Sequence, residues 1–212
     1  MNRGFTLVEL VVSIAIFVMM TALVVAKYGA FNQSTLLTDT AYDVALALHT
    51  AESYGLSVKN NFAASGGNFT APYGIDFDVD PAGHSCGLTM SNSTNLILFA
   101  DFDPIGAPDG LCSSGDSAIT TYTLTRGAYV SALCVGTVGS CTPVNKLDIN
   151  FIRPDPEANI CYHDQGADTT SCNYSHAEIT IKASDGSTRM IAVEHNGQIS
   201  VLQSLTPAST GH

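Results

Sequence analysis

The chain has 212 residues, a formal net charge of −11 and charged side chains at only 13% of its positions. Its few Lys and Arg residues are scattered, whereas a nucleic-acid surface would need them clustered in a basic patch. The composition therefore indicates no nucleic-acid partner. The length allows one domain with its own hydrophobic core in addition to a terminal anchor.

An apolar segment begins close to the N terminus. It carries no charge from Leu10 to Ala26, and when it is extended back to Phe5 its one carboxylate is Glu9. At about 1.5 Å per helical residue, the stretch from Phe5 to Ala26 would be about 33 Å long, enough to cross the hydrocarbon core of a bilayer. Because a carboxylate is costly in lipid, Glu9 is a candidate functional residue.

Residues 4–10 read GFTLVEL and lead directly into this apolar run. The combination resembles the N-terminal signature of type IV pilins and type II secretion pseudopilins. The resemblance implies that a prepilin peptidase cleaves after Gly4 and methylates the new terminal amine of Phe5. It also implies that Glu9 pairs with the terminal amine of a neighbouring subunit during assembly. The chain departs from many pilins in having no helix-kinking proline before Pro72.

A secretory signal peptide is the first alternative for this segment, with residues 24–26 (VVA) as its cleavage site. Glu9 within the apolar core and the length of the run argue against it. A plain membrane anchor is the second alternative, but it explains neither Glu9 nor the Gly4-Phe5 pair. The pilin resemblance implies a single-pass cytoplasmic (inner) membrane protein whose exported head enters a surface or periplasmic fibre.

A helical pattern continues beyond the apolar segment. One stripe of small and apolar residues recurs at spacings of three and four: Leu37, Ala41, Val44, Leu48 and Ala51. This spacing predicts an amphipathic helix whose stripe packs against a sheet of the same chain. We expect one helix from Phe5 to about Tyr54, ended by Gly55.

Short strand candidates fill the rest of the chain. They lie at residues 74–79, 95–102, 118–125, 128–135, 147–152, 177–182, 189–194 and 198–202. Asp185-Gly186 and Asn196-Gly197 predict the two turns of a C-terminal three-stranded meander. Arg126-Gly127 predicts a hairpin between residues 118–125 and 128–135.

The expected fold class is α+β, with a long N-terminal helix packed on an antiparallel, pilin-like head. The expected divisions are a leader at 1–4, a transmembrane and assembly helix at 5–27, its amphipathic continuation at 28–58, a β-rich head at 59–203 and a tail at 204–212. Within the head, the stretches YGIDF (73–77), LFAD (98–101) and NGQISV (196–201) resemble H-type minor pseudopilins.

Six cysteines follow residue 85: Cys86, Cys112, Cys134, Cys141, Cys161 and Cys172. Their number fits an oxidising, exported location and a set of disulfides. Pairing of sequence neighbours is our expectation. The alternative is a zinc site formed by Cys161, His163, Cys172 and His176, although this spacing is not a familiar zinc pattern.

An acidic turn is the candidate metal site. Asp101, Asp103 and Asp109 surround a Gly-containing turn just after a strand, and carboxylates so arranged suit calcium. The EF-hand pattern fails here, because Ile105 and Cys112 occupy ligand positions. A solvated acidic turn is the alternative. No cofactor other than this calcium is expected.

The familiar hydrolase, zinc-protease and nucleotide-binding motifs are missing, so no enzyme activity is expected. The sequence instead predicts a structural subunit, of minor type, in a type IV pilus or type II secretion pseudopilus. Its implied partners are the prepilin peptidase, the membrane assembly platform, other pilin subunits and membrane lipid. The alternative is a membrane-anchored surface binding protein that never polymerises.

Overall fold

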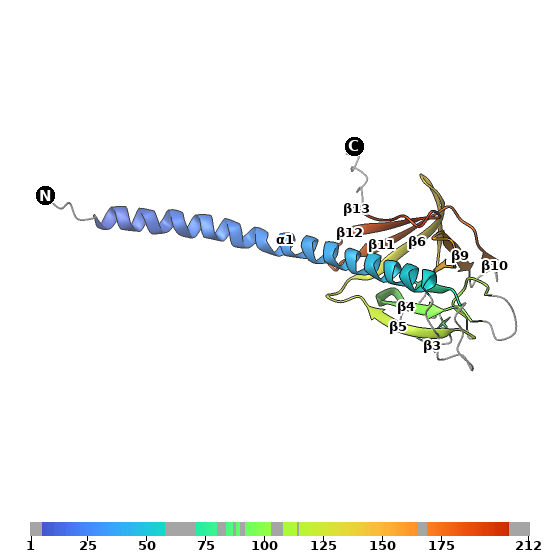
Figure 1. Ribbon diagram of the computed structural model, residues 1–212. Helices are drawn as coiled ribbons and strands as arrows, with labels where there is room; N and C mark the ends of the chain where they lie inside the picture. Colours follow the sequence, from blue (N-terminus) through green and yellow to red (C-terminus); the bar gives the residue numbers. More distant parts are fainter. Residues whose placement is uncertain are drawn as a thin grey trace. The chain divides into compact units, whose positions relative to one another are not determined.

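The computed structural model describes residues 6–57, 71–79, 84–86, 88–89, 92–102, 108–113, 115–164 and 169–203. A helix, α1 (Leu7–Leu56), precedes a series of strands, β1 to β13 (Figure 1). The chain forms two compact units, residues 1–36 and 37–212, which are described separately. Gly4, Phe5, Asp103 and the predicted tail at 204–212 lie outside the described residues.

The first unit contains the apolar part of α1. Residues Leu7–Val25 have a mean hydropathy of 2.6, and none of this stretch is buried by other parts of the protein. Its length and composition are sufficient to cross a membrane. No residue of the predicted signal cleavage site at 24–26 interrupts the helix.

The second unit begins with the amphipathic part of α1. The predicted stripe from Leu37 to Ala51 is confirmed, because each of its members is at most 1% exposed. The helix ends at Leu56, and Gly55 lies inside it. Gly55 was therefore wrongly predicted as the terminator. A Cβ at this position would clash with the carbonyl oxygen of Phe151, so the glycine allows the helix to approach a strand closely.

Two antiparallel sheets and a small hairpin make up the rest of this unit. The first sheet contains β1 (Tyr73–Asp78), β4 (Asn95–Ala100), β5 (Ser117–Thr123), β8 (Lys146–Phe151), β9 (Ala158–Asp164) and β10 (Thr169–Ser171). Its order is β10-β9-β8-β1-β4-β5. A two-stranded hairpin, β2 (His84–Ser85) and β3 (Leu88–Thr89), and a 3-10 turn, η1 (Asn92–Thr94), precede β4.

The second sheet has the order β13-β12-β11-β6-β7. Its strands are β6 (Tyr129–Thr137), β7 (Ser140–Val144), β11 (His176–Lys182), β12 (Thr188–Glu194) and β13 (Ile199–Gln203). The predicted C-terminal meander is confirmed, since β11 pairs with β12 and β12 with β13. The glycines of its two turns, Gly186 and Gly197, both have positive φ, of 87° and 86°.

The predicted hairpin at Arg126-Gly127 is wrong. β5 pairs with β4 in the first sheet, whereas β6 pairs with β7 and β11 in the second. Arg126 and Gly127 do form a turn, with φ values of 60° and 76°. The turn carries the chain from one sheet to the other instead of joining two paired strands.

One hydrophobic cluster unites both sheets with the stripe of α1. It includes Ile75 and Phe77 of β1, Ile149 of β8 and Ile179 of β11, all of them fully buried. The α+β fold class is therefore confirmed.

The six cysteines form three disulfides, and each joins neighbours in the sequence: Cys86–Cys112, Cys134–Cys141 and Cys161–Cys172. Because Cys161 and Cys172 are bonded to each other, neither offers the thiolate that a zinc site would need. His176, the third proposed ligand, lies between the carboxylates of Glu178 and Glu194. The zinc alternative is therefore wrong.

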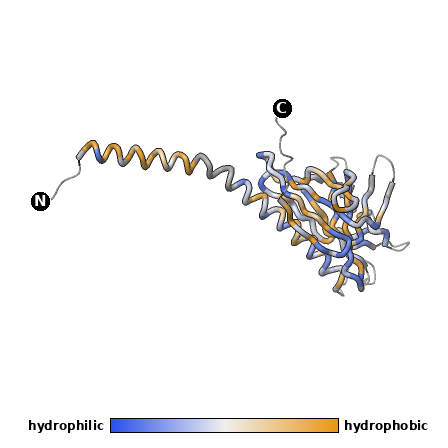
Figure 2. Tube along the Cα trace, turned by 90° about the horizontal axis from the view of Figure 1, so that it is seen from above, coloured by the Kyte–Doolittle hydropathy of each residue, from blue (hydrophilic) through white to orange (hydrophobic). Residues whose placement is uncertain are grey.

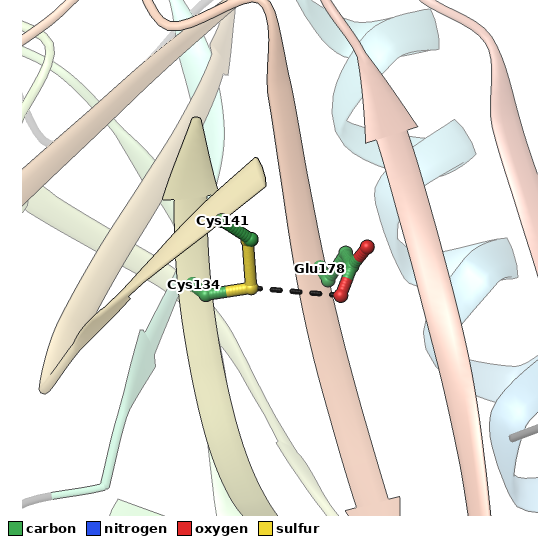
Figure 3. Close-up of side chains that lie close together, drawn as sticks. All are labelled: Cys134, Cys141 and Glu178. Carbon is green, nitrogen blue, oxygen red and sulfur yellow. Dashed lines mark hydrogen bonds between the residues drawn. A yellow bond between two sulfur atoms is a disulfide. The ribbon is translucent and has the colours of Figure 1, made fainter. Parts of the chain in front are cut away.

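The Cys134–Cys141 disulfide links β6 to β7 on the outer side of the second sheet (Figure 3). Glu178 Oε2, on the adjacent strand β11, lies 3.5 Å from Cys134 Sγ. Because a disulfide sulfur carries no hydrogen, this approach is a van der Waals contact.

Burial lowers the pKa of His176, but its hydrogen bonds to Glu178 and Glu194 outweigh burial and raise that pKa overall.

Candidate functional site

The N terminus of α1 is capped by reciprocal hydrogen bonds between Thr6 and Glu9. The Thr6 hydroxyl oxygen accepts the Glu9 backbone N–H at 3.2 Å. In return, Glu9 Oε2 accepts the Thr6 backbone N–H at 3.3 Å and the Thr6 hydroxyl at 3.2 Å. This arrangement is a capping box, which satisfies backbone donors that the first helical turn leaves open.

The capping box fixes where the Glu9 charge lies. The carboxylate is held beside the helix N terminus, where the partial positive charge of the helix dipole favours an anion. Among the described residues, the hydrogen bonds given to the Glu9 side chain all use Oε2. The Glu9 side chain is also exposed, so its carboxylate is accessible from outside the helix.

The remaining polar side chains of the apolar segment bond within the helix. The Ser13 hydroxyl donates to the Glu9 carbonyl, and the Thr21 hydroxyl donates to the Phe17 carbonyl. The outer surface is consequently apolar along the segment (Figure 2), and large side chains such as Phe17 and Met19 are 71% and 70% exposed. A continuous apolar surface of this kind requires lipid or other apolar helices around it.

The prokaryotic N-terminal methylation motif matches residues 1–25 of this chain. The N terminus is that of a type IV pilin or pseudopilin. The motif supports a pilin-type precursor that prepilin peptidase processes and that assembles with other pilin subunits, and the apolar helix near the N terminus is suited to anchoring it in a membrane. Comparison with characterised proteins and with solved structures found no match.

Of the functional residues predicted at the N terminus, the structure describes Glu9 and leaves Gly4 and Phe5 undescribed. Glu9 lies in the first turn of α1, in contact with Thr6. Gly4 and Phe5 precede the described residues. The role of Thr6 was missed in the sequence, although a Thr followed three residues later by Glu before an apolar run is itself a capping-box pattern.

The acidic turn of the head is built on backbone hydrogen bonds. Asp101 is 1% exposed, and its Oδ2 accepts the Gly110 N–H at 2.8 Å. Asp109 is exposed and accepts the Leu111 N–H at 2.9 Å. Asp103 lies outside the described residues. Calcium binding by Asp101, Asp103 and Asp109 therefore stays a prediction.

A further carboxylate, that of Asp116, lies beside Asp101. Its two carboxylate oxygens accept the backbone N–H groups of Phe102 and Ser113 at 2.7 and 2.6 Å. Burial, followed by the nearby charges of Asp116 and Asp109, raises the pKa of Asp101 to about 7, although the Gly110 hydrogen bond opposes the shift. The carboxylates thus order the loop by accepting hydrogen bonds, and Asp101 holds a proton more tightly than an exposed Asp does.

Proposed function

We propose that this prepilin is a minor structural subunit of a type IV pilus or a type II secretion pseudopilus. The observation that carries the proposal is the fully exposed apolar helix with one carboxylate held in its first turn. Before assembly the helix lies in the cytoplasmic membrane, with the head on the exported side. During assembly the apolar surface moves from lipid to the helices of neighbouring subunits.

Glu9 would guide this transfer. Cleavage after Gly4 would leave the amine of Phe5 as the new N terminus, and methylation preserves its positive charge. In the dry interior of a fibre, pairing the Glu9 carboxylate with a neighbour's terminal amine would offset the cost of burying either charge. The capping box supports this role because it holds the exposed Glu9 carboxylate in a fixed position at the start of the helix.

Filament incorporation of a Glu9→Gln variant tests the proposal. Glutamine keeps the size and the hydrogen-bonding oxygen of the side chain but removes the charge. We expect normal membrane levels of the variant and little or none of it in filaments sheared from cells. Glu52→Gln, on the same helix within the head, is the matched control and should enter filaments like the wild type.

A second outcome would favour the non-polymerising anchored protein. In that case neither the wild type nor the variant would leave the membrane fraction with sheared filaments. Equal incorporation of the wild type and Glu9→Gln would instead contradict the role of Glu9 while keeping the protein in the fibre.

A further inference from the structure

Charged side chains lie on the outer face of the two central strands of the first sheet. β1 and β8 are neighbours, and their inward-facing residues join the hydrophobic cluster. Their alternate residues point to the opposite face, as in any strand. Asp76 of β1 is paired with Asp148 of β8, and Asp78 is paired with Lys146.

This outer face is covered by the segment that contains Gly110 and Cys112. Lys146 Nζ donates to the Cys112 carbonyl at 2.9 Å, and the side-chain amide of Asn150 donates to the Gly110 carbonyl. The Cys86–Cys112 disulfide fastens the cover. As a result Asp76, Asp78, Asp148 and Lys146 are exposed by only 2%, 1%, 0% and 5%.

An amine and a carboxylate face each other in this enclosed layer. Lys146 Nζ lies 3.5 Å from Asp76 Oδ1, and the side chains of this pair are 6% and 2% exposed. The carboxylate oxygens of Asp148 and Asp76 are within 4.8 Å of each other. The carboxylate of Asp148 is fully buried, and it interacts with the Asp76 carboxylate and with the Cys112 backbone.

Burial and neighbouring charges shift the pKa values of the groups in this cluster. Burial, and then the charge of Asp76, raise the pKa of Asp148 well above its usual value. Asp148 therefore holds a proton more tightly than an exposed Asp does, and it lies close enough to Asp76 to share that proton. Burial lowers the pKa of Lys146, but Asp148, Asp76 and Asp78 together outweigh that effect and raise the pKa overall. The amine must consequently lose its proton within the cluster and not to solvent.

We propose that Lys146 and Asp76 condense into an intramolecular isopeptide bond, with Asp148 as the group that moves the protons. The three components are a buried nucleophilic amine, a buried carboxyl carbon beside it, and a neighbouring carboxylic acid. No further ligand or enzyme is required, because all of these groups belong to the folded head. The bond is independent of the proposed assembly of the helix.

The reaction balances without an oxidant or a reductant. Asp148 gives its proton to Asp76, which becomes a neutral carboxylic acid, and then accepts a proton from the Lys146 ammonium. Nζ attacks Cγ of Asp76, so that a C–N bond forms and a tetrahedral intermediate results. Asp148 then gives its proton to the departing hydroxyl and takes up the second proton that Nζ loses. One C–O bond breaks, one water leaves, and Asp148 ends as it began.

The enclosed site favours this condensation. Two buried charges, which are costly to keep dry, become one neutral amide. Exclusion of water by the cover also protects the amide from hydrolysis. The product would join β1 to β8 covalently at the centre of the first sheet, so that a head pulled within a fibre could not separate these strands.

Tryptic digestion of the full chain purified from membranes tests the proposal, after its disulfides are reduced and alkylated. An amide at Lys146 blocks cleavage there, and trypsin does not cut Arg153-Pro154. We expect residues 60–126 joined to residues 127–182, with a mass one water lower than that of the two peptides together. Complete recovery of linear peptides 127–146 and 147–182 would overturn the proposal.

Variants test the role of each group in the same digest. Lys146→Met and Asp148→Asn should both yield only uncrosslinked peptides, whereas Asp101→Asn, a buried carboxylate outside the cluster, should keep the crosslink. Crosslinking of Asp148→Asn to the wild-type extent would remove Asp148 from the reaction. If a variant fails to fold, the wild-type digest still decides whether the bond exists.

Discussion

Thr6 and Glu9 illustrate how one pair of side chains serves both the helix and its proposed assembly. The reciprocal bonds stabilise the first turn of α1 and also hold the Glu9 carboxylate in one place. The sequence alone indicated Glu9, because a charge in an apolar segment is unusual. It did not indicate how Glu9 is oriented, since that depends on a hydrogen bond that only the folded first turn creates.

The Thr6→Val substitution tests this positioning. Valine keeps the shape of threonine but cannot cap the helix, which should cost about 0.5–2 kcal/mol of local helix stability. We expect unchanged membrane levels and a several-fold lower share of the protein in sheared filaments. Thr21→Val is the control, because it makes the same change in the middle of the apolar segment. The Thr21 hydroxyl donates to the Phe17 carbonyl of the same helix. Equal losses for the two variants would contradict a specific role for Thr6.

The burial of the cluster at Lys146 could not be predicted from the sequence of β1. The alternation of Ile75 and Phe77 with Asp76 and Asp78 is typical of a strand with one face in water. In the structure both faces of β1 are buried. A distant segment, fastened by a disulfide, covers the second face, and no local pattern reports such a cover.

At the scale of whole elements, local signals predicted local pairing well. The meander of β11, β12 and β13 followed from two Gly-containing turns, because each turn joins strands that pair with each other. The same reasoning failed for β5 and β6, because β5 pairs with β4 whereas β6 pairs with β7 and β11 in the other sheet. β7 and β9 were missed: Pro143 interrupts the first, and β9 mixes polar and apolar residues without strict alternation.

The Gly55→Ala substitution tests whether close packing against β8 outweighs the higher helix propensity of alanine. Alanine normally stabilises a helix interior by about 1 kcal/mol relative to glycine. Here its Cβ would clash with the Phe151 backbone, and overpacking of this kind typically costs about 1–3 kcal/mol. We expect a lower melting temperature for Gly55→Ala and little change for Ser53→Ala, an exposed position of the same helix. A rise in melting temperature for Gly55→Ala would contradict the close approach of α1 to β8.

For the molecule as a whole, the pKa shifts of buried groups predict how its stability depends on pH. The folded pKa of Asp101 is about 7 and its ordinary value is 3.8, so the folded head binds more protons between these limits. Its contribution to stability is therefore complete below about 3.8 and is lost as the pH rises through about 7. The raised pKa of His176 acts in the same direction, with its contribution lost as the pH rises above 6.5.

Thermal unfolding of the full chain in detergent at a series of pH values measures this dependence. Asp101→Asn keeps an oxygen for the Gly110 N–H but does not titrate, so the fall in melting temperature between about pH 4 and 7 should become shallower. Asp155→Asn, at an exposed position away from this loop, is the control. Parallel curves for the wild type and Asp101→Asn would show that Asp101 has an ordinary pKa in the folded head.

The division of the helix into an apolar and an amphipathic part was predicted from the sequence, because an apolar run and a striped helix differ in composition. The identity of the fibre was not, since the matched motif covers only residues 1–25. The head carries whatever distinguishes one pilin-like subunit from another, and its short strand motifs occur in many β proteins.

The first residue of the protein recovered from sheared filaments tests the central claim most directly. Mass spectrometry of the N-terminal peptide should find Phe5 at the start, with a methyl group on its amine. This result would show both prepilin processing and presence in a fibre. Protein that begins at Lys27 would establish a secretory signal instead, and protein that begins at Phe5 but stays with the membrane would contradict assembly.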